Sequence, residues 1–409
     1  MASHLKSTII EYTQTVGSWN EIDEMVLPAL FYQRFFGHHI LDPNWTWKKH
    51  FFHQILNLLL FIYVSIGTFE CLKMTNDIEL QAEAYYTFIM IIIFLLKITL
   101  FINSRIIFRD LYVTVKDTLM DVIRRNTIAG NKGVFKTGNR IVLSLLCIVI
   151  VPIFTYEITT LWNYVVGNRI LLSRSTLTLM PMTTPYYEIA WILHTIFFFE
   201  VSSTIILDMW FVLLIYFLCA ALMGLANILN IENRNLGESE VCYAERLNVA
   251  LRNYYYTHLK LNKYLLKLIK MYKLSALIPL CNGGLCICLN LLLMNNIMRI
   301  CVNISTHCFQ EINWRFAPHM LPMFAEIFAY NWFGEQIKTK MTDVKMALLN
   351  FDWTSLKSKD RKSYLTIIIF MSKDFGIKTI SGHELSLITM AAVLKMTYQV
   401  FTVLQTMDG

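Results

Sequence analysis

The chain has 409 residues, of which 56% are hydrophobic and 16% are charged, against about 45–50% and roughly 25% in soluble domains. A water-soluble fold this apolar could not cover its surface with polar side chains, so the composition predicts contact with lipid. Gly and Pro are scarce, at 15 and 8 residues, which argues against collagen-like repeats, disordered tracts and a β-barrel. The net charge of +7 is small for this length and predicts no nucleic-acid partner. The expected fold class is therefore an all-α, polytopic membrane protein.

The nine Cys residues form neither the framework of a secreted disulfide-rich protein nor the spacing of a zinc site. Most lie in apolar stretches, where a thiol behaves as a small hydrophobic side chain, and no cofactor or metal is expected. The N-terminus is charged and has no early apolar segment, so no cleavable signal peptide is expected. The sequence contains no nucleophile-elbow, phosphate-loop or metalloprotease motif, so an enzyme is not expected.

Seven apolar stretches are long enough to cross the hydrocarbon core of a bilayer, which needs roughly 20 helical residues. They cover about 53–72, 84–103, 141–165, 188–225, 274–296, 318–336 and 384–405. The fourth would be roughly 57 Å long as a helix, so we expect it to project into water on the cytoplasmic side. The run 364–371 is too short to span and is interrupted by Lys-Asp-Phe-Gly at 373–376. We therefore expect a cytoplasmic half-helix and a split last helix.

Basic residues predict the orientation of these spans. Of the 36 Lys and Arg residues, 27 fall on the face that carries the N-terminus and 5 on the opposite face. The positive-inside rule then places the N-terminus in the cytoplasm and the short C-terminus, residues 406–409, outside. A glycosylation sequence at Asn303 falls in an external loop, where modification is possible, whereas the one at Asn44 is cytoplasmic and should stay bare.

The sequence predicts a single membrane domain over residues 1–409, with cytoplasmic anchor parts at about 226–273 and 337–377. Apolar residues at intervals of three and four in 243–273 predict an amphipathic helix that continues into the fifth span. Residues 126–138 contain three Gly and two Asn residues, which predicts a flexible cytoplasmic loop. No internal repeat is visible, which argues against the inverted-repeat transporters.

Charged side chains within the spans are costly in lipid and therefore invite a functional interpretation. Lys97 in the second span and Glu200 in the fourth lie at similar depth and could pair. Glu157, Asp208 and Glu326 are further candidates for such contacts. These charged side chains could pair with one another and fix the contacts between helices, or they could line a pathway for ions. The sequence is compatible with both roles.

The outer halves of spans two, three, four and six are rich in aromatic and Met side chains. Such a set could line an apolar pocket with few polar groups, as small-molecule sites usually do. Thr155, Ile158 and Trp162 share one helix face, although ordinary packing with an interfacial aromatic belt explains the same spacing more simply. The candidate ligand-binding residues are Tyr85, Tyr86, Phe88, Ile89, Thr155, Ile158, Thr159, Trp162, Trp191, His194, Phe198, Met320, Met323, Phe324 and Ile327.

The last span interleaves Thr397, Gln399, Thr402 and Gln405 with apolar side chains. A helix that partly lines water would use such groups, because Thr and Gln stabilise hydrated ions while rings of Val can gate a pore by dewetting. Hydrogen bonds between helices explain the same residues equally well. Lys395 does not suit a cation pore, so we expect it to face a neighbouring helix or to extend to the interface.

Four stretches near the C-terminus resemble the insect odorant receptor family. They are FAYNWFGE at 328–335, ALLNFDW at 347–353, Ser381-Gly382 and TYQVFTVL at 397–404. The rest of the chain resembles the family in pattern only, through its seven spans, cytoplasmic N-terminus and long fourth span. Gln405 and Thr406 depart from the closing motif of the related gustatory receptors. This departure favours the odorant receptors. It also leaves the position of the gate residues along the last helix undetermined by one helical turn.

The resemblance implies a tuning subunit that forms a heterotetrameric cation channel with an odorant co-receptor, in the plasma membrane of olfactory sensory neuron dendrites. It implies a volatile, mostly apolar ligand bound in the outer half of spans two, three, four and six, and a pore lined by the last helix. The pore or gate residues implied are Gln399, Thr402 and Val403, and the ligand-contacting positions of span three are Thr155, Ile158 and Trp162.

Three other classes of membrane protein are alternatives to an odorant receptor subunit. A gustatory receptor subunit shares the architecture and is the nearest alternative. A G-protein-coupled receptor would have an external N-terminus, an Asp-Arg-Tyr-like triplet and an Asn-Pro-x-x-Tyr motif, and the sequence has none of these. A secondary transporter would show paired broken helices and internal symmetry, which the sequence also lacks.

Overall fold

A computed structural model of the chain describes residues 2–13, 15–74, 78–126, 130–169, 171, 182–231, 238–301, 307–371 and 376–407. Within these ranges the fold is helical, and the only β-type pairing is an isolated bridge between Lys378 and Glu384. The elements are α1 (Ala2–Thr13), α2 (Glu21–Phe35), α3 (Phe51–Met74), α4 (Ile78–Asn103), α5 (Arg105–Thr114), the π-helical turn η1 (Val115–Leu119), α6 (Met120–Asn126), α7 (Gly130–Val165), α8 (Tyr186–Ile228), α9 (Glu240–Tyr272), α10 (Leu277–Cys301), α11 (His307–Leu349), α12 (Ser358–Met371) and α13 (Leu387–Met407).

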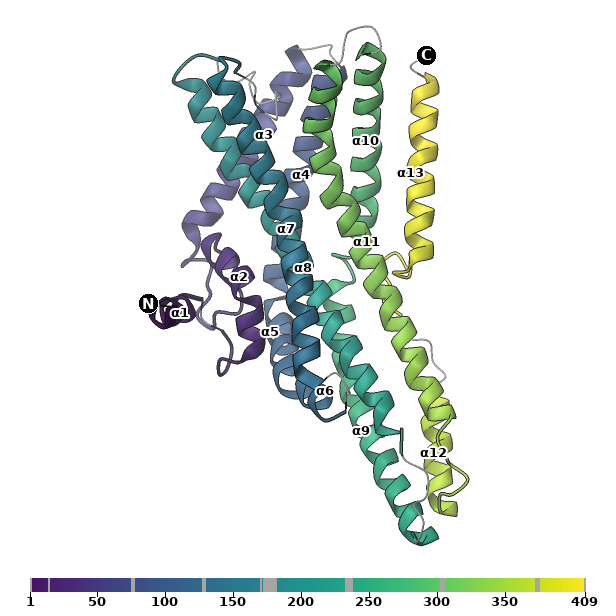
Figure 1. The fold of residues 1–409 in the computed structure, drawn as a ribbon. Helices are drawn as coiled ribbons and strands as arrows, with labels where there is room; N and C mark the ends of the chain where they lie inside the picture. The colour runs from purple at the N-terminus through teal and green to yellow at the C-terminus, as the bar shows by residue number, and fades with distance from the viewer. Residues whose placement is uncertain are drawn as a thin grey trace.

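The helices form an elongated bundle in two parts (Figure 1). The upper part holds α3, α4, α7, α10, α13 and the first halves of α8 and α11, and the C-terminus lies at its end. The lower part holds α5, α6, α9 and α12 with the second halves of the two long helices. The seven predicted spans fall on α3, α4, α7, α8, α10, α11 and α13, and the span predicted at 188–225 extends along α8 into the lower part.

Several helices are built to contact lipid. Four of those described, α3, α4, α7 and α8, are long and apolar enough to cross a membrane, and the bent pair α9–α10 raises the number to five. Residues 387–403 of α13 form a shorter apolar helix. Large apolar side chains are exposed on the bundle, such as Phe52 of α3 and Phe154 of α7 at 83% and 61%. An apolar outer surface of this kind needs lipid around it, which confirms an all-α, polytopic membrane protein.

The central helix α8 spans 43 residues, and the second half of it is almost entirely buried. The long fourth helix predicted at 188–225 is thus confirmed. Its lower half is packed by α9, α6 and η1, and the Tyr264 hydroxyl of α9 donates a hydrogen bond to the Leu214 carbonyl of α8 at 3.2 Å. Buried aromatic rings, including Trp210 against Phe108 and Tyr112, fill the junction between the two parts.

The amphipathic helix predicted at 243–273 is α9, but it does not run straight into the next span. The chain bends by 44° at residues 273–276 before α10 begins. The Lys273 carbonyl at this bend accepts a hydrogen bond from the backbone N–H of Ile380 at 2.9 Å. The bend is therefore tied to the segment that precedes α13.

The loop predicted at 126–138 is wrong for residues 130–138, which form the first turns of α7. Gly in a helix costs about 1 kcal/mol relative to Ala, and tertiary contacts offset that cost here. The Tyr216 hydroxyl of α8 donates to the Val134 carbonyl at 2.9 Å. Gly138 packs so closely against Met25 of α2 that a Cβ there would lie 2.6 Å from the Met25 sulfur.

The last two helices confirm the predicted split. The half-helix α12 packs on α11, where the Tyr364 hydroxyl donates to the Leu348 carbonyl at 3.0 Å. The final helix begins at Leu387, after Ser386, whose hydroxyl accepts a hydrogen bond from the Thr389 backbone N–H at 3.2 Å. Helix α13 then lies at the edge of the bundle, against α10 and α11 (Figure 1).

Candidate ligand cavity

A cavity of about 130 Å³ lies between α4, α7, α8, α10 and α11. One buried water needs only about 10–15 Å³, so the space can accept a small organic molecule. Its lining combines many apolar side chains with a few polar ones, as small-molecule sites usually do. The lining residues are Glu83, Tyr86, Thr87, Met90, Ile93, Phe94, Lys97, Ile148, Val149, Pro152, Ile153, Tyr156, Phe197, Phe198, Val201, Ser202, Thr204, Ile205, Asn282, Asn290, Pro322, Met323 and Glu326.

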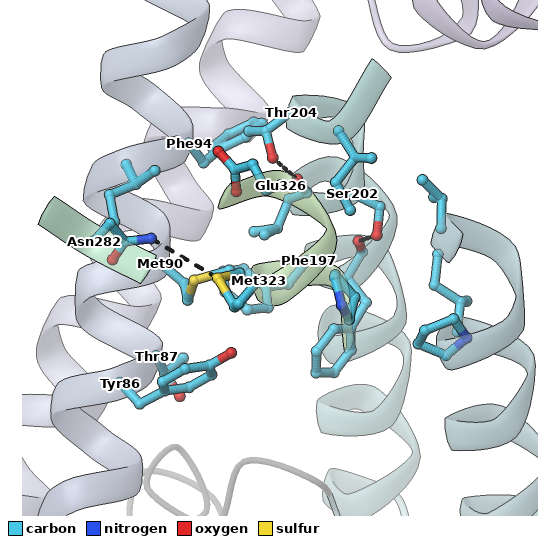
Figure 2. A pocket seen from close by; sticks show the side chains of 18 of the residues that line it. Tyr86, Thr87, Met90, Phe94, Phe197, Ser202, Thr204, Asn282, Met323 and Glu326 are labelled. Atoms are coloured by element: carbon cyan, nitrogen blue, oxygen red, sulfur yellow. Dashed lines mark hydrogen bonds between the residues drawn. The ribbon is translucent and has the colours of Figure 1, made fainter. Parts of the chain in front are cut away.

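The cavity has two distinct ends (Figure 2). Glu326 lies at one end, and Tyr86 and Thr87 lie at the other, with Met90 and Met323 between them. The Asn282 side-chain amide of α10 approaches the Met323 sulfur at 4.0 Å. Two flexible thioethers in the middle give the cavity a wall that can adapt to ligand shape.

Helix α4 lines the cavity with one face. Of its four predicted ligand residues only Tyr86 lies there. Tyr85 is 49% exposed, Phe88 stacks on Phe61 of α3, and Ile89 packs on the cluster around Cys286. The structure adds Glu83, Thr87, Met90, Ile93, Phe94 and Lys97. Steps of three and four residues from Tyr86 lead to all of these except Thr87, which lies one such step from Glu83 and from Met90.

Helix α7 turns a different face to the cavity from the predicted one. Val149, Pro152, Ile153 and Tyr156 line it, at the spacing of a single helix face. The predicted residues Thr155, Ile158, Thr159 and Trp162 do not line it. Thr155 and Thr159 donate to backbone carbonyls one turn earlier in α7, and Ile158 and Trp162 are exposed.

Of the three predicted ligand residues of α8, one lines the cavity and two contact neighbouring helices. Phe198 lines the cavity. Trp191 instead donates its indole N–H to Glu157 of α7 at 3.0 Å, and His194 packs edge-on against Tyr63 of α3. These two residues hold α8 against neighbouring helices.

On α11, Met323 lines the cavity, while Met320, Phe324 and Ile327 do not. Phe324 is 39% exposed, and Ile327 is buried against Gly283 of α10, which has no room for a Cβ. Of the fifteen predicted ligand residues, the structure therefore brings Tyr86, Phe198 and Met323 to the cavity.

A buried ionic network closes the Glu326 end. The Lys97 ammonium of α4 donates to Asp208 Oδ2 of α8 at 2.7 Å and to Glu326 Oε1 of α11. The Tyr330 hydroxyl donates to the other oxygen of Asp208 at 2.7 Å. This network joins three helices at one level.

The predicted pairing of Lys97 with Glu200 is wrong. Glu200 contacts a different neighbour, since its Oε2 lies 3.5 Å from His38 Nε2, with both side chains buried. Lys97 instead pairs with Asp208, about two helical turns further along α8. Counting residues from the predicted ends of the two spans therefore did not identify the partner of Lys97.

The predicted pore residues lie on α13. Much of the surface of this helix is not covered by other helices of the same chain. Gln399 and Val403 are exposed, Thr402 is partly buried, and Lys395 is also exposed. Thr397 is buried and faces α10, where a Cβ on Gly284 would lie 3.0 Å from its hydroxyl oxygen.

The predicted glycosylation site, Asn303, lies outside the described residues. No group of three or more His, Cys, Asp or Glu side chains in the described ranges could hold a metal ion.

Fold and cavity together define the class of this protein: an all-α, polytopic membrane protein with a mostly apolar cavity between its helices. The family model described as 7tm Odorant receptor matches residues 77–398, and the chain belongs to this family. This is a family of receptors and not of enzymes. A search of curated proteins finds no match.

Solved structures of similar fold include the insect olfactory receptor OR5 of Machilis hrabei. The form in complex with eugenol shares 14% identity, with a TM-score of 0.69 over 99% of each chain. Another structure of OR5 shares 12% identity, with a TM-score of 0.59 over 98% of this chain and 97% of that one. The likeness supports the fold over nearly the whole chain.

Proposed function

We propose that the chain is the odorant-binding subunit of a ligand-gated cation channel. The observation that carries the proposal is the cavity between α4, α7, α8, α10 and α11, which lies inside an odorant receptor fold and is mostly apolar. The similar receptor OR5 was solved in complex with eugenol, a small organic molecule. We therefore assign the cavity as the site of a volatile, mostly apolar ligand.

Helix α11 offers a direct connection from the cavity to α13. Met323 and Glu326 line the cavity, and Asn331 and Gly334, one to two turns further, contact the residues that precede α13. A ligand that binds more tightly when α11 is displaced shifts the population towards that state. The displacement would move the start of α13, which opens the pore.

The pore requires further subunits. The exposed face of α13 with Gln399 and Val403 would line water at the centre of a heterotetramer formed with an odorant co-receptor. Thr402 and Val403 would form its narrowest part, with Lys395 turned towards a neighbouring helix. The lower part of the bundle, α9 with α12 and the end of α11, would form the cytoplasmic anchor between subunits. The excess of basic residues on the N-terminal face supports an orientation with this anchor in the cytoplasm. The membrane would be the plasma membrane of olfactory dendrites.

The test is whole-cell current during application of an odorant panel, in cells that express this chain alone, a co-receptor alone, or both. Odorant-evoked cation current only in the co-expressing cells, without G-protein signalling, is the expected result. Responses that require a G protein, or odorant responses identical to those of the co-receptor alone despite surface expression of both chains, would overturn the proposal.

A further inference from the structure

A second cavity, of about 20 Å³, lies between α4, α8, α11 and the bend that joins α9 to α10. One water molecule needs about 10–15 Å³, so this cavity can hold a single water and no larger ligand. Six of its ten lining residues are polar, namely Lys97, Ser104, Asp208, Tyr272, Ser275 and Tyr330. A polar cavity of this size suits a water molecule, whereas apolar cavities stay dry.

The hydroxyl of Tyr272, at the end of α9, has no hydrogen-bond partner among the described residues, and the residue is 3% exposed. Its ring packs edge-on against Phe211 of α8, and the ring of Tyr330 stacks on the same Phe211. The Tyr330 hydroxyl reaches Asp208 directly, at 2.7 Å. Tyr272 makes no such direct bond, and a buried hydroxyl without a partner is costly. A partner within the cavity would remove this cost.

The ionic network can supply the other hydrogen bonds of a water molecule. The Lys97 ammonium has three N–H groups, of which Asp208 and Glu326 receive two. The two oxygens of a carboxylate can together accept about four hydrogen bonds, so Asp208 can accept one from water in addition to those from Lys97 and Tyr330. The Ser275 hydroxyl, on the bend, also lines the cavity. A water here finds the two to four polar partners that ordered waters use.

We propose that the second cavity binds one ordered water molecule, which hydrogen-bonds to the Tyr272 hydroxyl and to the Lys97–Asp208 pair. The water joins the bend between α9 and α10 to the ionic network. The bend is bonded to the segment before α13 through the Lys273 carbonyl and the Ile380 N–H, and Lys97 also lines the ligand cavity. The water therefore lies on a route from the ligand cavity to the final helix. A role for this route in channel opening rests on the proposed function, whereas the water site itself does not.

The first test compares the melting temperature of the full chain in lipid nanodiscs with those of two Tyr→Phe variants. Tyr272→Phe removes a hydroxyl that binds the water, so we expect a lower melting temperature because a hydrogen bond is lost. Tyr254→Phe, on the same helix, is the matched control, since its hydroxyl is also buried without a partner among the described residues but lines neither cavity. Removal of an unpartnered hydroxyl lifts a desolvation penalty, so this variant should be at least as stable as the wild type. Equal losses in both variants, or no loss in Tyr272→Phe, would overturn the inference.

The second test is a cryo-electron microscopy structure of the full chain at a resolution that shows ordered waters. We expect a density peak at about 2.5–3.0 Å from the Tyr272 hydroxyl oxygen and within hydrogen-bonding distance of Lys97 or Asp208. A map that shows other buried waters but none here, or a direct bond from the Tyr272 hydroxyl to Asp208, would overturn the inference. Neither test uses an odorant or a current, so failure of the water site leaves the proposed channel function intact. Absence of odorant-evoked current, in turn, contradicts the channel proposal and not the water site.

Discussion

The side-chain oxygen of Asn331 accepts a hydrogen bond from the backbone N–H of Ser386 at 3.2 Å, which joins the middle of α11 to the residue before α13. The amide nitrogen of the same side chain donates to the Ile327 carbonyl at 2.8 Å, one turn earlier in α11. Asn331 is fully buried. Asn331 therefore connects the middle of α11 to the start of the final helix, close to the contact between Gly334 and Leu385.

Replacement of this side chain should weaken the connection. Asn331→Ala leaves the buried N–H of Ser386 without its acceptor, at a cost of about 1–3 kcal/mol. We expect a lower melting temperature and a shift in the ligand concentration for half-maximal current. Asn350→Ala, at an exposed position directly after the end of α11, serves as the control. Equal effects of the two substitutions would contradict a coupling role for Asn331.

Gly334 marks the closest approach between α11 and the segment before α13. A Cβ at this position would overlap the carbonyl oxygen and the Cβ of Leu385, and backbone atoms cannot easily move away. Gly334→Ala should therefore destabilise the protein by about 1–3 kcal/mol, measured as the melting temperature of the purified chain. Gly138→Ala is the matched control, because the close contact of its methyl group is with the flexible end of Met25. A stable Gly334→Ala variant with normal currents would show that the two segments can separate freely.

Much of the fold follows from hydrophobic run lengths. The apolar stretches predicted at 53–72 and 188–225 fall inside α3 and α8, because a span must reach across the bilayer whatever it packs against. The interruption at 373–376 also predicted the separation of α12 from α13. The first turns of α7 were missed, because contacts with Met25 and Tyr216 offset the low helix propensity of their glycines.

The cavity could be predicted only in outline. The helices that line it were expected, apart from α10, but the face of each helix was not, since its rotation is set by packing that a single sequence does not reveal. Trp162 and Ile158 are therefore exposed, while Pro152 and Tyr156 of the same helix line the cavity. Asn282 of α10 gave no signal, because an amide in a span is as readily explained by helix–helix hydrogen bonding.

The ionic network should be essential for stability. Lys97→Met leaves Asp208 and Glu326 buried without their cation, at a cost of about 3–5 kcal/mol, so we expect a lower melting temperature and poor surface expression. The triple variant Lys97→Met, Asp208→Asn, Glu326→Gln removes all three charges and should recover most of this loss. A triple variant as unstable as Lys97→Met would show that the lysine acts through packing instead of charge.

Met323 and Trp162 provide opposite predictions about ligand sensitivity. Met323→Trp fills the middle of the cavity and should raise the half-maximal ligand concentration by about tenfold or more, which corresponds to about 1.4 kcal/mol. Trp162→Ala removes an exposed side chain away from the cavity and should leave the sensitivity unchanged. Both are measured as concentration–response curves of whole-cell current at matched surface expression. The reverse pattern would place the ligand near the end of α7 and not in the cavity.

A charged substitution on α13 tests whether its exposed face lines the pore. Val403→Glu adds a carboxylate where the proposed pore is narrowest, so the conductance or the rectification of the channel should change. Single-channel recording from cells that also express the co-receptor measures both. Unchanged conductance and rectification would remove Val403 from the pore.

The most direct test of the ligand site is a cryo-electron microscopy structure of the receptor complex with an activating odorant. We expect ligand density between Met90 and Met323, and a displaced contact between Asn331 and Ser386 relative to the ligand-free complex. An empty cavity, with density for the activating ligand at another place on this chain, would contradict it.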